Sequence, residues 1–147
     1  MEIERKYLIH KLPENLDTYP YKKIEQAYLC TEPVVRIRKQ DQEYFLTYKG
    51  KGLLVREEYN LPLTKDSYMH LREKIDGRLI IKKRYLIPLS NELTIELDIF
   101  GGDLAPLMLA EVEFPNETSA NSFTPPKWFG EDVTFSGEYH NSRLSQI

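Results

Sequence analysis

The sequence lacks several features that define familiar classes of protein. Cys30 is the only cysteine among 147 residues, which excludes an internal disulfide framework and a cysteine-based zinc site. The charged N-terminus has no apolar signal-peptide segment, and no apolar run approaches the roughly 20 residues of a membrane-spanning helix. These absences predict a cytoplasmic protein that contacts no membrane and whose lone thiol stays reduced.

A strong excess of charge of either sign is also missing. Lysine and arginine total 20 against 23 aspartates and glutamates, which leaves a net charge of −3. Without a basic excess we expect no nucleic-acid partner, so any anion site must be local. A hydrophobic content of 41% with 29% charged residues indicates a globular chain, and its length suits one domain over residues 1–147.

Segments of alternating character dominate the chain and predict strands. We expect them at 2–9, 24–31, 34–40, 43–49, 53–63, 78–88, 92–100 and 107–115. Short joints such as "TEP" and "QDQ" favour antiparallel neighbours. Helices are predicted at 64–75, where Thr64 or Asp66 can cap the start, and near 117–123. The predicted fold is mainly β (α+β): a closed eight-stranded antiparallel barrel with a few flanking helices.

Charged residues occupy one face of most of these strands. On the first strand, alternation places Glu2, Glu4 and Lys6 together and turns Arg5 the other way. The acidic residues on such faces are Glu2, Glu4, Glu58, Glu96, Asp98, Glu111 and Glu113. The basic residues are Lys6, Arg36, Arg38, Lys49, Arg56, Lys82 and Arg84.

Two arrangements could accommodate these faces. An antiparallel sheet can leave one face in water, although such faces usually mix in Ser, Thr, Gln and Asn. Alternatively, the barrel closes with the charges inward and forms a polar tunnel, while the helices and a docked tail at 131–147 cover its apolar outside. Buried charges of this kind need partners or ligands, because an unpaired buried ion is costly.

The two kinds of charge indicate one kind of ligand. Arginine side chains match phosphate oxygens in bidentate geometry, and lysines add point charges. Clustered carboxylates bind hard cations such as Mg²⁺ or Mn²⁺. Together they favour a metal-bound polyphosphate, and phosphoryl transfer depends mainly on positioning and charge neutralisation.

These residues resemble a known family. The opening "EIERK" is similar to the Glu-x-Glu-x-Lys signature of the CYTH superfamily, the triphosphate tunnel metalloenzymes. Further similar segments follow in family order: "VRIRK" (35–39), "LTYKG" (46–50), "REEYNLPL" (56–63), "IKKRYLIPL" (81–89), "ELDIF" (96–100), "LAEVEF" (109–114) and "GEDVTF" (130–135). The resemblance spans essentially the whole chain and is closest to the small bacterial inorganic triphosphatases.

The resemblance implies metal-dependent hydrolysis of triphosphate to pyrophosphate and phosphate inside the tunnel, with Mg²⁺ or Mn²⁺. It implies a catalytic set of Glu4, Lys6, Arg56 and Glu58. The phosphate-binding residues that it implies are Lys6, Arg36, Arg38, Lys49, Arg56, Lys82 and Arg84. The metal-binding residues that it implies are Glu2, Glu4, Glu58, Glu96, Asp98, Glu111 and Glu113.

One departure and several alternatives accompany this prediction. The fifth strand has Glu58-x-Asn60 where the family often has Glu-x-Glu, and an asparagine supplies no negative charge. The same fold could serve a thiamine triphosphatase, a class IV adenylyl cyclase, or a polyphosphate-binding module without turnover. The sequence is compatible with a homodimer but does not determine the oligomeric state. His10, His70 and His140 are expected to have surface roles.

Overall fold

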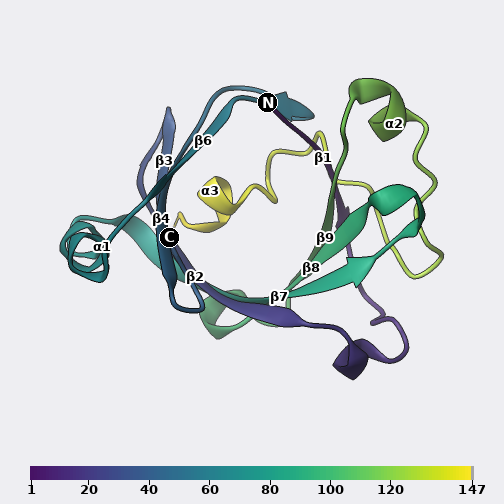
Figure 1. Cartoon of the computed structure of the whole chain (residues 1–147), viewed down its shortest axis with the longest axis horizontal. Coiled ribbons are helices and arrows are strands. Elements are labelled where there is room, and N and C mark those ends of the chain that lie inside the picture. Colours follow the sequence, from purple (N-terminus) through teal and green to yellow (C-terminus); the bar gives the residue numbers. More distant parts are fainter. Residues whose placement is uncertain (147) are drawn as a thin grey trace.

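Nine antiparallel strands curl into a nearly closed ring in the computed structural model, which describes residues 1–146 (Figure 1). Ile147, the last residue of the predicted domain and tail, lies outside the described residues. The strands are β1 (Glu2–Leu8), β2 (Tyr21–Thr31), β3 (Val34–Gln40), β4 (Glu43–Lys49), β5 (Val55–Arg56), β6 (Glu58–Pro62), β7 (Asp76–Pro88), β8 (Thr94–Phe100) and β9 (Met108–Glu113). The predicted mainly β, antiparallel barrel is confirmed.

The predicted fifth strand, 53–63, is two strands. Around the ring the order is β5-β1-β9-β8-β7-β2-β3-β4-β6. β5 pairs with β1, where Glu2 faces Arg56, and β6 pairs with β4, where Lys49 faces Glu58. The interruption at Glu57 arises because the early part of this segment bonds only to β1 and the later part only to β4. The predicted count of eight was therefore one too low, and this single segment closes the ring.

Helices are few and short. They are α1 (Lys65–Arg72), α2 (Glu117–Asn121) and α3 (Asn141–Leu144), with single 3₁₀ turns η1 (Leu16–Thr18), η2 (Ser90–Glu92) and η3 (Gly102–Leu104). Thr64 caps α1 as predicted, since its hydroxyl accepts from the backbone N–H of Ser67. Tyr68 then anchors α1 against Ala27 and Ile37 on the outer face of the sheet. No helix within residues 1–146 has the length and apolar character needed to cross a membrane.

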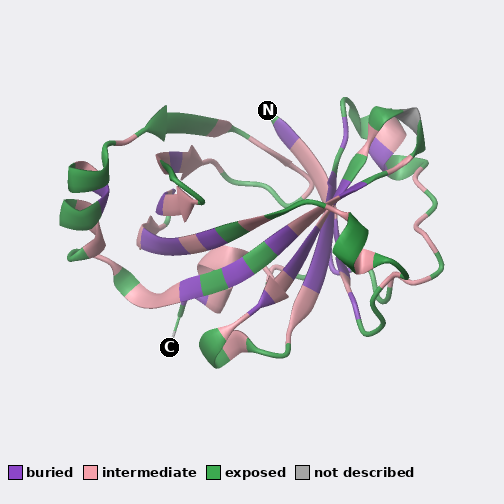
Figure 2. Ribbon diagram, turned by 60° about the horizontal axis from the view of Figure 1, so that its bottom comes forward, coloured by how far each residue is buried: buried purple, intermediate pink, exposed green. Residues whose placement is uncertain are grey.

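Two of the three apolar clusters lie on the outer faces of the strands, and the charged residues lie on the inner faces. A third cluster shares the inner faces with the charged residues and packs against Tyr139 and Leu144 of the tail; its members on the strands include Val34, Ile80, Phe100 and Leu109. Buried and exposed positions alternate along the strands (Figure 2). On β7 the alternation is inverted relative to an ordinary surface strand, because Lys82 is 2% exposed whereas Ile81 is 51% exposed. Asp98 is 0% and Lys6 is 6% exposed. The alternative of a solvated charged face is therefore wrong, and the inward arrangement is confirmed.

The C-terminal segment corrects the expected position of the tail. Residues 131–134 run along the outer edge of β1, where the Val133 N–H donates to the Lys6 carbonyl at 2.8 Å. The chain then turns inward, so that α3 lies inside the ring of strands (Figure 1). The tail is docked, as expected, but its last part lies within the barrel instead of covering its outside.

Arg5, which points away from the interior, holds β1 to this tail. Its guanidinium donates to the carbonyl oxygen of Ala120 at 2.9 Å and forms an ion pair with Asp132. Asp132 also accepts from the backbone N–H of Thr134 at 2.9 Å and from its hydroxyl at 2.6 Å. Burial opposes ionisation of Asp132, but the hydrogen bonds from Thr134 and Arg5 hold its pKa below the ordinary value.

Replacing Asp132 by Ala should lower the free energy of unfolding by about 1–2 kcal/mol, because several hydrogen bonds to one carboxylate are lost. Urea unfolding at pH 7 measures this change. Glu131→Ala is the matched control, since Glu131 is exposed and its side chain makes no hydrogen bond or ion pair within the described part of the chain. Equal midpoints for the two variants would contradict a structural role for the Arg5–Asp132 pair.

Candidate functional site

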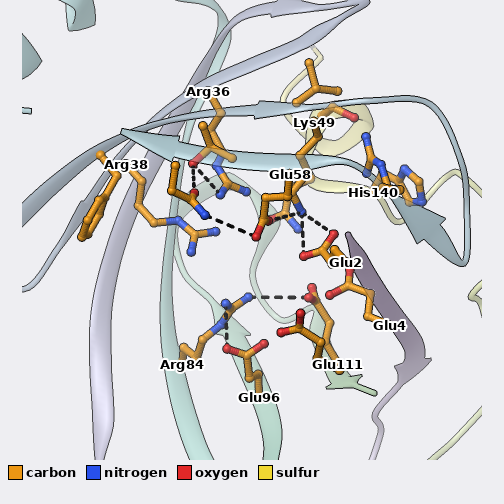
Figure 3. Close-up of a pocket in the computed structure, with 18 of the residues that line it drawn as sticks. Glu2, Glu4, Arg36, Arg38, Lys49, Glu58, Arg84, Glu96, Glu111 and His140 are labelled. Carbon is orange, nitrogen blue, oxygen red and sulfur yellow. Dashed lines mark hydrogen bonds and ion pairs between the residues drawn. The ribbon is translucent and has the colours of Figure 1, made fainter. Parts of the chain in front are cut away.

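The ring encloses a cavity of about 340 Å³. The charged residues singled out from the strand alternation line it, all except Lys82 and Asp98. They come from β1, β3, β4, β5, β6, β7, β8 and β9, so that nearly every strand contributes at least one (Figure 3). The structure thus brings together groups that lie more than 100 residues apart in sequence.

Strand register decides which of these groups face one another. Between β1 and β9, Glu4 is directly opposite Glu113 and Lys6 is directly opposite Glu111. Side chains that are opposite across an antiparallel pair lie about 5 Å apart at their Cβ atoms, close enough to interact. One pair therefore sets two carboxylates together, and the next sets a cation against a carboxylate.

A buried ion-pair network forms the base of the cavity. Arg84 donates from Nε to Asp98 Oδ1 at 2.7 Å, and Lys82 Nζ lies 2.7 Å from Asp98 Oδ2. Glu111 lies 3.6 Å from Lys6 and 3.8 Å from Arg84. Burial opposes ionisation of both carboxylates, but these cations hold the pKa of Asp98 below, and that of Glu111 well below, its ordinary value.

Lys82 and Asp98 lie beneath the cavity. Neither side chain has exposed surface, at 0% each, and Lys82 Nζ also donates to the side-chain oxygen of Asn141 at 3.0 Å. Burial lowers the pKa of Lys82 to about 7. This placement gives no support to the predicted phosphate contact of Lys82 or to the predicted metal contact of Asp98, and both stay predictions.

Lys49 connects acidic groups on two strands. Its Nζ lies 3.0 Å from Glu2 and 3.5 Å from Glu58. Asn60, at the position where the family often has an acid, donates to Glu58 at 3.3 Å and accepts from the Thr47 hydroxyl at 2.6 Å. Asn60 thus orients Glu58 through hydrogen bonds and adds no charge at the edge of the cavity.

Three arginines in the cavity wall have no carboxylate partner within the described residues: Arg36, Arg38 and Arg56. The Nε of Arg36 is buried and has no hydrogen-bond partner among residues 1–146. Burial, together with repulsion from Arg36 and Arg84, lowers the pKa of Arg38 to about 9. Arg36 and Arg38, which are adjacent on β3, together with Arg56 on β5 constitute a site for an anion with several oxygens.

Two carboxylates in the wall likewise have no cationic partner among residues 1–146, namely Glu4 and its register partner Glu113. Burial and repulsion from Glu111 and Glu2 raise the pKa of Glu4 well above its ordinary value. Burial and neighbouring acids, Glu2 first, also raise the pKa of Glu113. Carboxylates that repel one another in this way favour binding of a cation.

Within the described residues, no three His, Cys, Asp or Glu side chains converge into a ready-made cage for a metal ion. Mg²⁺ does not require one, because it usually binds to one or two carboxylates, keeps several waters and takes the remaining ligands from substrate phosphates. Glu4 and Glu113, with Glu2 nearby, fit this mode of binding. The cavity thus has Arg36 and Arg38 of β3 on one side and Glu2 and Glu4 of β1 across it (Figure 3), whereas Arg56 of β5 lies next to Glu2.

The sequence was compared with models of known protein families. The family model described as the CYTH domain matches residues 1–147. The chain belongs to the CYTH family. Membership implies a divalent metal cofactor, for which Glu4 and Glu113 are the available carboxylates.

Related CYTH proteins include two curated enzymes and a solved structure. The chain is 41% identical over 148 residues to the inorganic triphosphatase of Nitrosomonas europaea, covering 98% of this chain and 96% of the relative. It is 32% identical over 112 residues to the inorganic triphosphatase of Acetivibrio thermocellus, covering 75% of this chain and 70% of the relative. The crystal structure of the inorganic triphosphatase NE1496 superposes with a TM-score of 0.74 at 37% identity, covering 100% of this chain and 95% of that chain.

Sequence reasoning missed the contribution of the tail to this CYTH cavity. His140 lines the cavity with Asn141 and Ser142, so the expected surface role of His140 is corrected. Its pKa is lowered to about 4 by burial and by the nearby cations Lys6, Arg56 and Lys49. The run "YHN" at 139–141 has no strand periodicity, so alternation could not have assigned it to the interior.

Proposed function

We propose that this chain hydrolyses inorganic triphosphate to pyrophosphate and phosphate with the help of Mg²⁺ or Mn²⁺. The observation that supports the proposal is that one cavity combines three arginines and two glutamates that form no ion pair within residues 1–146. A polyanion and a divalent cation would neutralise both sets at once. The names of the two curated relatives, both inorganic triphosphatases, support this substrate.

Each group has a role that its surroundings allow. The arginines without a carboxylate partner among residues 1–146 are available to bind phosphate oxygens: Arg36, Arg38 and Arg56. Lys6 and Arg84, which form ion pairs with Glu111, add further positive charge. Glu4 and Glu113 would hold the metal ion, with Glu2 nearby. When bound, a divalent ion polarises phosphoryl oxygens and offsets their negative charge.

The reaction requires water to attack the terminal phosphorus and the bond to the bridging oxygen to break. Burial opposes ionisation of Glu58, but Lys49 and the hydrogen bond from Asn60 lower its pKa. Glu58 therefore stays ionised at neutral pH and can accept a hydrogen bond from the attacking water. Arginines fixed around the phosphates stabilise the charge that develops on the leaving group.

A substrate panel tests this proposal. With Mg²⁺ or Mn²⁺ present, kcat/KM for tripolyphosphate should exceed that for ATP and thiamine triphosphate by at least about tenfold, which corresponds to about 1.4 kcal/mol of transition-state binding. The lining offers few groups for a base or a thiazolium ring, because most of its side chains are charged. Phosphate release, measured with and without EDTA, gives both the preference and the dependence on metal.

Other outcomes of the panel would replace the proposal. Formation of cyclic AMP from ATP would favour an adenylyl cyclase, and preferred cleavage of thiamine triphosphate would favour a thiamine triphosphatase. Tight triphosphate binding without product at any divalent metal would favour a binding module. A cytoplasmic location is part of the proposal, supported by the single free thiol of Cys30.

A further inference from the structure

His140 projects into the cavity from the tail, not from the sheet. It immediately precedes α3, which lies inside the ring of strands (Figure 1), and it is seen beside Lys49 and Glu2 in the close-up (Figure 3). Its side chain makes no capping hydrogen bond to α3. Among residues 1–146, neither ring nitrogen of His140 has a protein hydrogen-bond partner. The ring is therefore available to a ligand.

The two residues that flank His140 are held in place by hydrogen bonds. The carbonyl oxygen of Tyr139 accepts from Lys6 Nζ at 3.0 Å. The side-chain oxygen of Asn141 accepts from Gln26 at 2.9 Å and from Lys82 at 3.0 Å. These contacts position the imidazole without using either of its nitrogens, and such pre-organisation lowers the entropic cost of binding a ligand.

The charges around His140 favour an anion over a cation. The charged groups that act most strongly on the pKa of His140 are the cations Lys6, Arg56 and Lys49, followed by the carboxylate of Glu111. Glu2, which is also near His140 in Figure 3, is engaged by Lys49 at 3.0 Å. Glu111 is already engaged by Lys6 and Arg84. Because the ring is neutral at pH 7, it offers one N–H donor to a phosphate oxygen without adding to the repulsion among these cations.

We infer that His140 binds the triphosphate directly, donating a ring N–H to a phosphate oxygen on the side of the cavity formed by Lys6, Lys49 and Arg56. The inference rests on the proposed function and adds a substrate contact that comes from the tail. The cavity wall is thus completed by a segment that no strand pattern predicts.

Binding of tripolyphosphate without metal tests the inference separately from turnover. Isothermal titration calorimetry in EDTA should show that His140→Ala weakens the affinity by about tenfold, as expected for a lost hydrogen bond to a charged group. His140→Gln keeps an N–H donor of similar reach and should retain affinity closer to that of the wild type. His70→Ala, on the exposed surface of α1, is the matched control and should bind like the wild type.

Three results would overturn the inference. The first is unchanged tripolyphosphate affinity in a folded His140→Ala protein. The second is a loss confined to Mn²⁺ affinity, which would make His140 a metal ligand. The third is equal weakening in the Ala and Gln variants with a lowered melting temperature, which would assign His140 a structural role. If the wild type fails to bind tripolyphosphate both in EDTA and with Mg²⁺ or Mn²⁺ present, the proposed function itself fails, and this result differs from each of the three above.

Discussion

Replacing Glu4 by Gln is expected to lower the rate of metal-dependent tripolyphosphate hydrolysis by at least about 100-fold, because even groups that merely support a metal ligand are worth about 10- to 100-fold. Glu4 and Glu113 are the carboxylates of the wall that no protein cation neutralises within residues 1–146. Glutamine keeps the size of the side chain but removes the charge that binds a hard cation. Phosphate release at saturating Mg²⁺ or Mn²⁺ measures the loss.

The same change should not weaken the fold. The pKa of Glu4 is raised by burial and by Glu111 and Glu2, so the folded protein binds more protons at this site than the unfolded chain. Ionisation of Glu4 therefore lowers stability as pH rises from the unfolded to the folded pKa. Glutamine does not ionise, so this loss of stability does not occur in the variant. Metal-free Glu4→Gln should therefore resist urea at pH 7 at least as well as the wild type.

Two comparisons separate loss of a metal site from other effects. Added Mn²⁺ should raise the melting temperature of the wild type more than that of Glu4→Gln, because a ligand stabilises only the state that binds it. Glu57→Gln removes one negative charge from an exposed position on the closing segment and should leave turnover unchanged. Full activity in Glu4→Gln would contradict the metal site proposed here.

The inward direction of the charged faces could be predicted because strand geometry alone determines it. Successive side chains alternate between two faces, so Glu2, Glu4 and Lys6 had to share one. The density of charge on these faces then indicated that the shared face was interior. The structure agrees, since Glu2 and Lys6 are buried and all three line the cavity.

The pairing of those charges could not be predicted, because it depends on register and on how the ring closes. Lys49 contacts Glu2, 47 residues away, because β4 pairs with β6 while β5, which precedes β6 in the same segment, pairs with β1. Lys82 and Arg84 share one face of β7, yet Lys82 is covered by Asn141 whereas Arg84 reaches the cavity. Which arginines and glutamates stay unpaired, and hence where ligands bind, follows from these long-range contacts.

The buried pair of Lys82 and Asp98 leads to the largest expected change in stability. Asp98→Asn removes the one charge that faces both Lys82 and Arg84 at hydrogen-bond distance. Arg84 would then lie in the interior without its nearest counter-charge, and leaving a buried charge uncompensated typically costs about 3–5 kcal/mol. Lys82, whose pKa burial already lowers to about 7, would lose the carboxylate that favours its charged form. The melting temperature should fall by about 10 °C or more for a chain of this length, measured by circular dichroism in metal-free buffer.

A matched variant isolates the effect of burial. Glu96 also pairs with Arg84, at 3.2 Å, but its side chain is 30% exposed, so Glu96→Gln should lower the free energy of unfolding by less than about 1 kcal/mol. Adding Lys82→Met to Asp98→Asn removes one of the two basic groups left without a carboxylate partner and should restore part of the lost stability. If the double variant were less stable than Asp98→Asn alone, lost packing and hydrogen bonding, not uncompensated charge, would explain the destabilisation.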